Sequence, residues 1–297
     1  MFDYTIGIPA RNESKTIYQM LDSLNADLSI QPVRGTIETV ICVNGTSDNT
    51  LKKILIAQQD FPKINIRVVE SEPGLLLAQR KIIHESNSKA NFVLFYNADI
   101  RINLGTTCRI IKYLNEHPEA HAVSGDQTPL KIPGVKYAIL NIEALHPELF
   151  RQPRKYLIGR CFGIRKTSYY VPERFLSDDM FLSNNLVLLH GPSAVQMVQN
   201  ASVVYIGPQT FKDYFRKIKR YSDELEKLYK SHPKFIALKA YFNRQPDSDL
   251  VNHLSIYEKN LLFVHDIIKY VFKKVARISL TPTWVPLMTT KDRKLYE

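Results

Sequence analysis

The sequence has no long hydrophobic run and very little cysteine. No segment of the 297 residues approaches the ~20 uninterrupted apolar residues that a membrane-spanning helix needs. The N-terminus leads directly into a short apolar run, without the basic region, apolar core and cleavage site of a secretory leader, so export is not expected. Three widely spaced cysteines, Cys42, Cys108 and Cys161, favour reduced thiols in a cytoplasmic protein over disulfides or a metal site.

Several patterns that mark other functions are also missing. No G-x-G-x-x-G follows the first apolar run, which argues against a dehydrogenase. The segment PARNESKT after that run contains no glycine, whereas a nucleotidyltransferase needs a glycine-rich loop there to hold a triphosphate. The pI of about 9.4 favours a polyanion-binding protein. However, the aromatic residues are not interleaved with the charges as stacking platforms, so no nucleic-acid partner is expected.

The positive charge is concentrated in the C-terminal third. The formal net charge is +11, and residues 211–297 contribute +8 of it through 18 Lys and Arg against 10 Asp and Glu. Such an excess fits an anionic membrane, a polyanionic ligand or a solvated helical face. A helix predicted over residues 257–277 combines an apolar stripe with basic residues, which suits peripheral docking on an anionic inner leaflet. Packing of the stripe on the catalytic domain is the alternative.

Apolar runs alternate with helical patterns through the first hundred residues. The run FVLFYNADI, residues 92–100, is typical of a fully buried strand that ends in a polar turn. Three further strands are predicted over residues 4–9, 36–43 and 64–71, with a helix in each interval. This alternation with short connections predicts an α/β fold with a doubly wound, mostly parallel sheet.

The pattern becomes less regular beyond residue 100. The predicted elements are a helix near 107–115, strands at 121–125, 157–166 and 201–206, a helix at 176–186, and helical stripes from 211 to 225 and from 257 to 275. The segment 126–156 contains several prolines and no clean period, which favours an irregular, mobile segment on the acceptor side of the site.

Polar segments follow the carboxyl ends of all four strands predicted in the first hundred residues. These segments are PARNE, NGTSDNT, EPG and NAD. In a parallel sheet such ends share one edge, which is the usual ligand crevice. Because each residue type is also common in turns and helix caps, the convergence of four loops is what indicates a binding site.

Two carboxylates are the strongest candidates for chemistry. Asp99 can anchor Mg²⁺ or Mn²⁺ if phosphate oxygens supply the remaining ligands, and an Asx turn is its alternative role. Asp179 can take a proton from an attacking hydroxyl as general base, with Asp178 as the alternative base. Helix capping is the structural alternative for this pair. A metal at the leaving group and a base at the nucleophile are what an inverting sugar transfer requires.

The order and spacing of these segments resemble inverting family 2 glycosyltransferases with the GT-A fold. The resemblance covers about residues 4–221. It rests on PARNE, on VNGTSDNT, on Gly74 followed by Ala78 and Arg80, on NAD in the place of a D-x-D metal motif, and on the pair Asp178-Asp179. Lys217, Arg220 and Tyr221 stand where processive members have Q-x-x-R-W.

The resemblance implies a role for each matched residue. Asp99 would bind Mn²⁺ or Mg²⁺, Asp179 would act as base beside Asp178, and Lys217, Arg220 and Tyr221 would face the acceptor or the diphosphate. The implied nucleotide-sugar-binding residues are Pro9, Ala10, Arg11, Asn12, Glu13, Val43, Asn44, Asp48, Gly74, Arg80, Asn97 and Ala98.

Three departures from the family pattern narrow these expectations. Asn97 replaces the first D-x-D carboxylate. Val43 replaces the aspartate that binds the nucleobase in the family, so specificity for uridine does not follow. Loss of Gln and Trp from the last motif favours single sugar additions over processive synthesis. The expected function is transfer of one hexosyl unit from a nucleotide-diphosphate sugar to a glycan or lipid-linked saccharide. The alternative is a non-catalytic scaffold or a polyanion-binding protein.

The expected domain organisation follows from the same resemblance. Residues 1–210 would form a GT-A catalytic domain, with a Rossmann-like nucleotide-sugar-binding half over 1–100 and an acceptor-side half over 101–210. Residues 211–297 would form a basic helical C-terminal region. The expected location is the cytoplasm, with contact to the inner face of the membrane and a role in polysaccharide biosynthesis.

Overall fold

The computed structural model describes residues 2–30, 33, 35–150, 155–172, 178–243 and 246–278. The chain divides into two compact units. The first contains Met1–Gln127 and Lys155–Val204, and the second contains Thr128–Arg154 and Tyr205–Leu295. This division does not test the domain boundary expected at residue 210, which stays a prediction.

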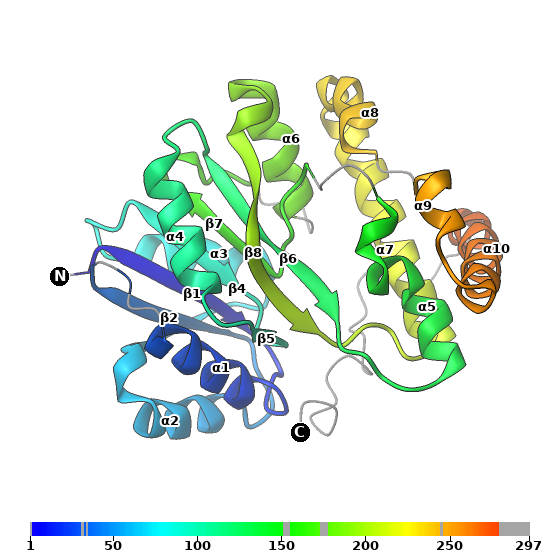
Figure 1. The fold of residues 1–297 in the computed structure, drawn as a ribbon. Coiled ribbons are helices and arrows are strands. Elements are labelled where there is room, and N and C mark those ends of the chain that lie inside the picture. Colours follow the sequence, from blue (N-terminus) through cyan, green and yellow to red (C-terminus); the bar gives the residue numbers. More distant parts are fainter. Residues whose placement is uncertain are drawn as a thin grey trace. The chain divides into compact units, whose positions relative to one another are not determined.

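An eight-stranded sheet with the order β3-β2-β1-β4-β7-β6-β8-β5 runs through the first unit (Figure 1). Its parallel part consists of β1 (Tyr4–Ala10), β2 (Ile37–Asn44), β3 (Ile66–Ser71) and β4 (Phe92–Tyr96). The strand β7 (Cys161–Arg165) is antiparallel to both β4 and β6 (Ala122–Pro129). The remaining strands are β8 (Val195–Tyr205) and β5 (Ile100–Ile102).

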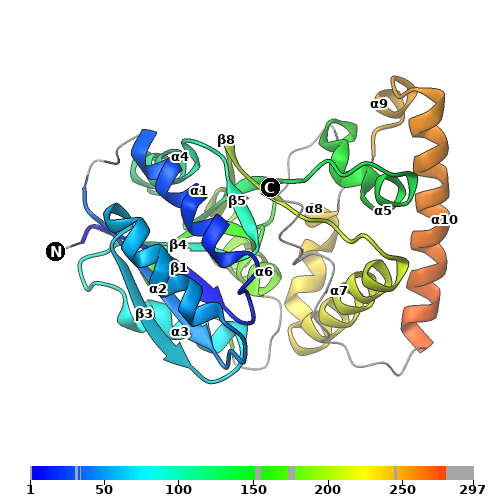
Figure 2. The same ribbon diagram turned by 90° about the horizontal axis from the view of Figure 1, so that it is seen from below.

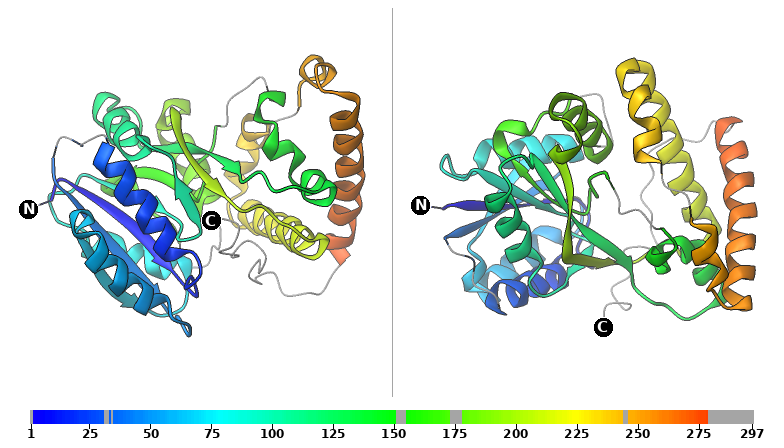
Figure 3. Two further views of the ribbon diagram at one scale, coloured as in Figure 1. Left: turned by 60° about the horizontal axis from the view of Figure 1, so that its bottom comes forward. Right: turned by 45° about the horizontal axis from the view of Figure 1, so that its top comes forward.

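Helices cover both faces of the parallel part. Figure 3 shows α1 (Ile17–Ile30) and α2 (Thr50–Asp60) on one face and α3 (Leu75–Glu85) on the other. All five residues of β4 are buried as a result, which explains why its sequence is continuously apolar. Two further helices of this unit are α4 (Thr106–Glu116) and α6 (Asp178–His190).

The second unit is helical where the structure describes it. Its helices are α5 (Val135–Leu145), α7 (Phe211–Ser231), α8 (Lys239–Phe242), α9 (Ser248–Asn252) and α10 (Ile256–Ile278). Figure 2 shows α5 and α7 beside α10. The contact with α5 uses Ile142, Leu261 and Leu262, whereas Tyr214 and Ile218 of α7 pack near Ile268 and Phe272.

The sheet and its flanking helices confirm the α/β, mostly parallel fold predicted from the sequence. The predicted irregularity of residues 126–156 was wrong, because β6 continues to Pro129 and α5 follows. The prolines had obscured this helix, but Pro133 precedes it and Pro147 follows it, so they delimit the helix without interrupting it. The strand β5 was missed because it is only three residues long.

Two findings concern the cysteines and the helices. Cys42, Cys108 and Cys161 are all free in the structure. Among the described helices, none combines the length and the apolar character required to cross a bilayer.

Candidate active site

The loops after β1 and β2 are joined by hydrogen bonds. Pro9 and Ala10 end β1, and the carbonyl oxygen of Ala10 accepts a bond from the side-chain amide of Asn44 at 3.3 Å. Asn12 has a φ of 54°, a left-handed conformation that Asn tolerates better than most residues. Its Oδ1 accepts a bond from the amide of Ser47 at 2.9 Å. The predicted PARNE and NGTSDNT segments therefore lie side by side.

Asp48 strengthens the same junction. Its Oδ2 accepts a bond from the Ser14 amide at 3.1 Å, and its Oδ1 accepts one from the Thr50 amide at 3.0 Å at the start of α2. The Thr50 hydroxyl accepts a bond from the Glu13 amide at 2.7 Å. Burial alone would raise the pKa of Asp48, but the bonds from Thr50 and Ser14 outweigh it and lower the pKa. Asp48 is therefore held ionised and shapes both loops.

The loop after β3 meets the loop after β2. A side chain on Gly45 would overlap the ring of Pro73, and Gly45 also has a left-handed φ of 62°. Only glycine satisfies both conditions. Gly74 follows Pro73 with a φ of 156°, and its carbonyl oxygen accepts the bond from Ala78 in the first turn of α3. Thus the EPG segment lies against the loop after β2, which is itself bonded to the loop after β1.

Asp99 lies in the turn after β4. Ala98 is buried, while Asn97 and Asp99 are half-buried. The amide of Asn97 donates a hydrogen bond to the carbonyl oxygen of Arg160 at 3.1 Å. This bond ties the NAD turn to the segment that precedes β7.

The same segment contacts the second candidate carboxylate. The amide of Gly159 donates a bond to Oδ2 of Asp179 at 3.1 Å. The other oxygen, Oδ1, accepts a bond from the amide of Met180 at 2.8 Å in the first turn of α6. Asn97 and Asp179, 82 positions apart in the sequence, are therefore connected through the two adjacent residues Gly159 and Arg160.

Asp178 has a different environment from its neighbour. It is buried, and one oxygen accepts a hydrogen bond from the side-chain amide of Gln79 on α3. Burial and the charge of Asp179 raise the pKa of Asp178 to about 7, although the Gln79 bond acts in the opposite direction. The hydroxyl of Tyr169 donates to Gln79 at 2.9 Å, so three buried or half-buried polar groups form one network.

Sequence reasoning missed several residues that hold this region together. Gln79, Gly159, Arg160 and Tyr169 were not predicted as part of the site. A glutamine among the apolar residues of a predicted helix is a weak indication of a polar contact in the core, and the sequence offers it at Gln79. Arg80, which was predicted to bind the nucleotide-sugar, donates a bond to the carbonyl oxygen of Val171 at 2.5 Å. Its role in nucleotide-sugar binding stays a prediction.

The remaining predicted residues have the following positions. Val43 and Asn44 end β2, and both are buried. Arg11 lies in the bend between β1 and α1. Lys217, Arg220 and Tyr221 lie on α7 in the second unit. Their predicted contact with acceptor or diphosphate stays a prediction.

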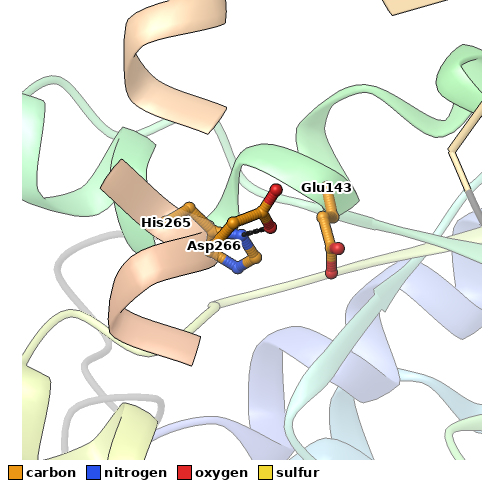
Figure 4. Close-up of side chains that lie close together, drawn as sticks. All are labelled: Glu143, His265 and Asp266. Atoms are coloured by element: carbon orange, nitrogen blue, oxygen red, sulfur yellow. Dashed lines mark hydrogen bonds and ion pairs between the residues drawn. The ribbon is translucent and has the colours of Figure 1, made fainter. Parts of the chain in front are cut away.

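A second group of potential metal ligands lies in the second unit. Glu143, His265 and Asp266 have ligand atoms within 4.8 Å of one another (Figure 4). However, Lys269 Nζ lies 2.5 Å from Glu143 Oε1, and the two ring nitrogens of His265 contact Asp266 at 3.3 Å and the Tyr214 hydroxyl at 2.8 Å.

These partners make the group a poor cation site. A cation on Glu143 would have to displace the ammonium group of Lys269. A cation on His265 would have to displace Asp266 or the Tyr214 hydroxyl, because these groups contact its two ring nitrogens. Burial of Glu143 acts to raise its pKa, but the Lys269 charge outweighs burial and lowers it. We therefore interpret the group as an internal polar network that joins α5, α7 and α10.

Comparison with known proteins identifies the family. The family model described as glycosyl transferase family 2 matches residues 5–169, more than half of the chain. The chain belongs to this family. It is therefore a glycosyltransferase, as the resemblance predicted. The matched residues include β1 from its second residue, β2 to β4 and β7, together with Asn97, Asp99 and Gly159.

Solved structures share the fold at low sequence identity. The mannosyltransferase PcManGT from Pyrobaculum calidifontis, in complex with GDP-Man and Mn²⁺, is 14% identical with a TM-score of 0.59, over 99% of this chain and 84% of that chain. A mycobacterial protein is 17% identical with a TM-score of 0.54, over 76% and 74%. S. aureus TarS 1-349 with UDP is 14% identical with a TM-score of 0.50, over 93% and 90%. No curated protein sequence matches the chain.

Proposed function

We propose that the protein transfers a single hexosyl unit from a nucleotide-diphosphate sugar to a hydroxyl of its acceptor, with inversion. The observation that carries this proposal is the connection from Asn97 through Arg160 and Gly159 to Asp179. Through it, the turn that contains Asp99 and the carboxylate of Asp179 bond to two adjacent residues of one backbone segment. A transferase needs a group for the diphosphate and a group for the acceptor hydroxyl close together but separate.

On the donor side, Asp99 would hold Mn²⁺ or Mg²⁺ together with the diphosphate. Its single carboxylate fits this role, because such ions in nucleotide sites use one or two carboxylates and complete their ligands with phosphate oxygens and water. A bound cation would stabilise the charge that develops on the leaving diphosphate. The loops after β1, β2 and β3 would enclose the nucleotide at the same sheet edge. PcManGT, with the same fold, is described with GDP-Man and Mn²⁺.

On the acceptor side, Asp179 would be the general base. The backbone amides of Gly159 and Met180 orient its two oxygens, and an ionised carboxylate can accept the proton of a sugar hydroxyl. Asp178 is less suited to this role, because it is buried and bonded to Gln79. Asp178 would instead position the start of α6. We propose a glycan or lipid-linked saccharide as acceptor, which fits polysaccharide biosynthesis in the cytoplasm at the membrane.

A thermal-shift panel tests the donor side. Melting temperatures are measured with UDP, GDP, CDP and dTDP, each with and without Mn²⁺, and repeated with Mg²⁺. Stabilisation by one nucleotide that requires the metal supports the proposal and names the donor class. Stabilisation of Asp99→Asn by the same amount would remove Asp99 as the metal ligand. Absence of any shift in the panel would favour the non-catalytic scaffold or the polyanion-binding protein.

Asp179→Asn tests the acceptor side. We expect turnover of the donor identified by the panel to fall by about a hundredfold or more, because general-base catalysis typically contributes 10²–10⁴-fold. Nucleotide-dependent stabilisation should be unchanged. Asp22→Asn is the matched control, because Asp22 is an exposed carboxylate on α1. Unchanged turnover in Asp179→Asn would exclude Asp179 as base.

A further inference from the structure

Helix α10 has apolar residues on two sides. Its inner side contains Leu261, Leu262, His265 and Ala276, all of them buried. The other side exposes a second set of apolar and aromatic residues, which we call the outer face: Ile256, Tyr257, Phe263, Val264, Ile267, Tyr270, Val271 and Val275. An ordinary surface helix is polar on the side away from its core, so the outer face needs a separate explanation.

The outer face is continuous along the helix. Ile256, Phe263 and Tyr270 are seven residues apart, close to two helical turns, and therefore lie in one row. Their side chains are 80%, 67% and 63% exposed. Ile267 and Val271 lie next to this row at i+4 and i+8 from Phe263. Within the second unit, α5 and α7 lie beside α10 (Figure 2), and the inner-side residues Leu261, Leu262 and His265 contact them. A contiguous apolar surface of this kind marks an interaction site.

The charges around the outer face have mostly one sign. Lys259, Lys273 and Lys274 lie on or beside it, while Asp266 is the acidic residue on that side. Lys274 Nζ lies 5.5 Å from the centre of the Tyr270 ring, so its aliphatic chain covers part of the aromatic surface. Two tyrosines, Tyr257 and Tyr270, add rings that are apolar in the body and polar at the tip, which suits a boundary between lipid and water.

We propose that the outer face of α10 binds the surface of an anionic lipid bilayer. The helix would lie in the plane of the interface, with its apolar row among the acyl chains and its lysines at the phosphate groups. The charge pattern distinguishes this partner from a second copy of the chain. A symmetric pair of outer faces would bring two lysine-rich surfaces together with few acidic residues to neutralise them.

A vesicle flotation experiment tests this proposal without any enzymatic assay, so its result is independent of the proposed function. The full chain is mixed with vesicles of phosphatidylcholine alone or of phosphatidylcholine with 30% phosphatidylglycerol. We expect the protein to float with the anionic vesicles and at least about tenfold less with the neutral ones. The double variant Phe263→Ser/Ile267→Ser should lose at least about tenfold in affinity, because it removes two apolar side chains from the interface.

Matched variants separate the apolar and electrostatic contributions. Lys273→Gln and Lys274→Gln should each weaken binding about fivefold, with a smaller effect in high salt. Asn260→Ser changes a polar residue of the same surface, and Leu189→Ser removes an exposed leucine from α6; both should bind as the wild type does. Circular dichroism melts verify that every variant is folded.

Four outcomes would overturn the proposal. One is equal flotation with neutral and anionic vesicles. Another is unchanged flotation of Phe263→Ser/Ile267→Ser. The third is the absence of flotation together with a dimer in light scattering that the same double variant dissociates, because the outer face would then be the contact between two copies. A variant that ends at Ile278 should retain flotation, and its loss in that variant alone would transfer the binding to residues 279–297.

Discussion

The amide of Gly159 lies 3.1 Å from Oδ2 of Asp179 and donates a hydrogen bond to it. A methyl group in place of the glycine hydrogen would come within 3.0 Å of the same oxygen, which is closer than side chains normally approach. The glycine therefore permits the contact, and the contact fixes the carboxylate. The orientation of the proposed base therefore depends on a residue outside its own helix as well as on the Met180 amide within it.

Gly159→Ala should displace the Asp179 carboxylate. We expect kcat to fall about 10- to 100-fold, because small misplacements of a catalytic group cost that much, while donor binding stays near the wild-type level. The measurement is turnover together with nucleotide-dependent melting. Gly163→Ala is a suitable control, since its methyl group would meet Ile110 and Leu114 in the core and should lower stability without altering turnover per folded molecule. Full turnover in Gly159→Ala would contradict the proposed role of Asp179.

The contact between Gly159 and Asp179 also illustrates what sequence reasoning could predict. The strands were predictable because β1 to β4 are short apolar runs, and their parallel order brought PARNE, NGTSDNT, EPG and NAD to one edge. The partners of Asp179 and Asp178 were not predictable. Gly159 is 20 residues away and Gln79 is 99 residues away, and neither lies in a motif that periodicity or composition can identify. Such contacts depend on tertiary packing.

Helix α10 gave a mixed result. Its bounds, Ile256–Ile278, agree closely with the predicted 257–277. The sequence could not assign its stripe of Leu261, Val264 and Ile268 to one side, because apolar residues surround most of the helix. The structure buries Leu261 and exposes Val264. The structure therefore packs one side of α10 on α5 and α7 and leaves a second apolar side exposed. Docking of the helix on a membrane or on the catalytic domain stays a prediction.

The pH dependence of stability should report on Asp178. Its pKa is raised from 3.8 to about 7 by burial and by the charge of Asp179. Between these two values the folded protein retains a proton that the unfolded chain has lost, so the free energy of unfolding should decrease as the pH rises from about 4 to about 7. Each unit of difference corresponds to about 1.4 kcal/mol. Above pH 7 this loss of stability is complete.

Asp178→Asn should remove this contribution. The amide oxygen can still accept the bond from Gln79, while no charge develops. We therefore expect urea unfolding to show a flatter profile between pH 4 and 7 and a variant that is more stable than the wild type above pH 7. Asp22→Asn, which changes an exposed carboxylate, should retain the wild-type slope. An Asp178→Asn profile parallel to that of the wild type would show that Asp178 is ionised throughout this range.

Asn97→Asp should increase metal affinity at the proposed donor site. Asn97 precedes Asp99 by two residues in the turn after β4, and it stands where the family pattern has a first carboxylate. A second carboxylate beside Asp99 would add charge for Mn²⁺. We expect the Mn²⁺ concentration needed for half-maximal nucleotide-dependent stabilisation to fall about tenfold. The matched control is Asn103→Asp, in a loop that contacts Ser202 of β8. An unchanged requirement in Asn97→Asp would place the metal away from this turn.

Asp27 on α1 should be essential for the stability of the first unit. Its two oxygens accept bonds from the amides of Thr106 and Thr107 at the start of α4, both at 3.0 Å, and its side chain is buried. Asp27→Ala would leave two buried amides without acceptors, which should lower the free energy of unfolding by about 2–4 kcal/mol. Ser29→Ala, on the exposed side of the same helix, should cost under about 1 kcal/mol. Urea unfolding at pH 7 measures both values, and equal losses would show that the buried amides of α4 find other partners.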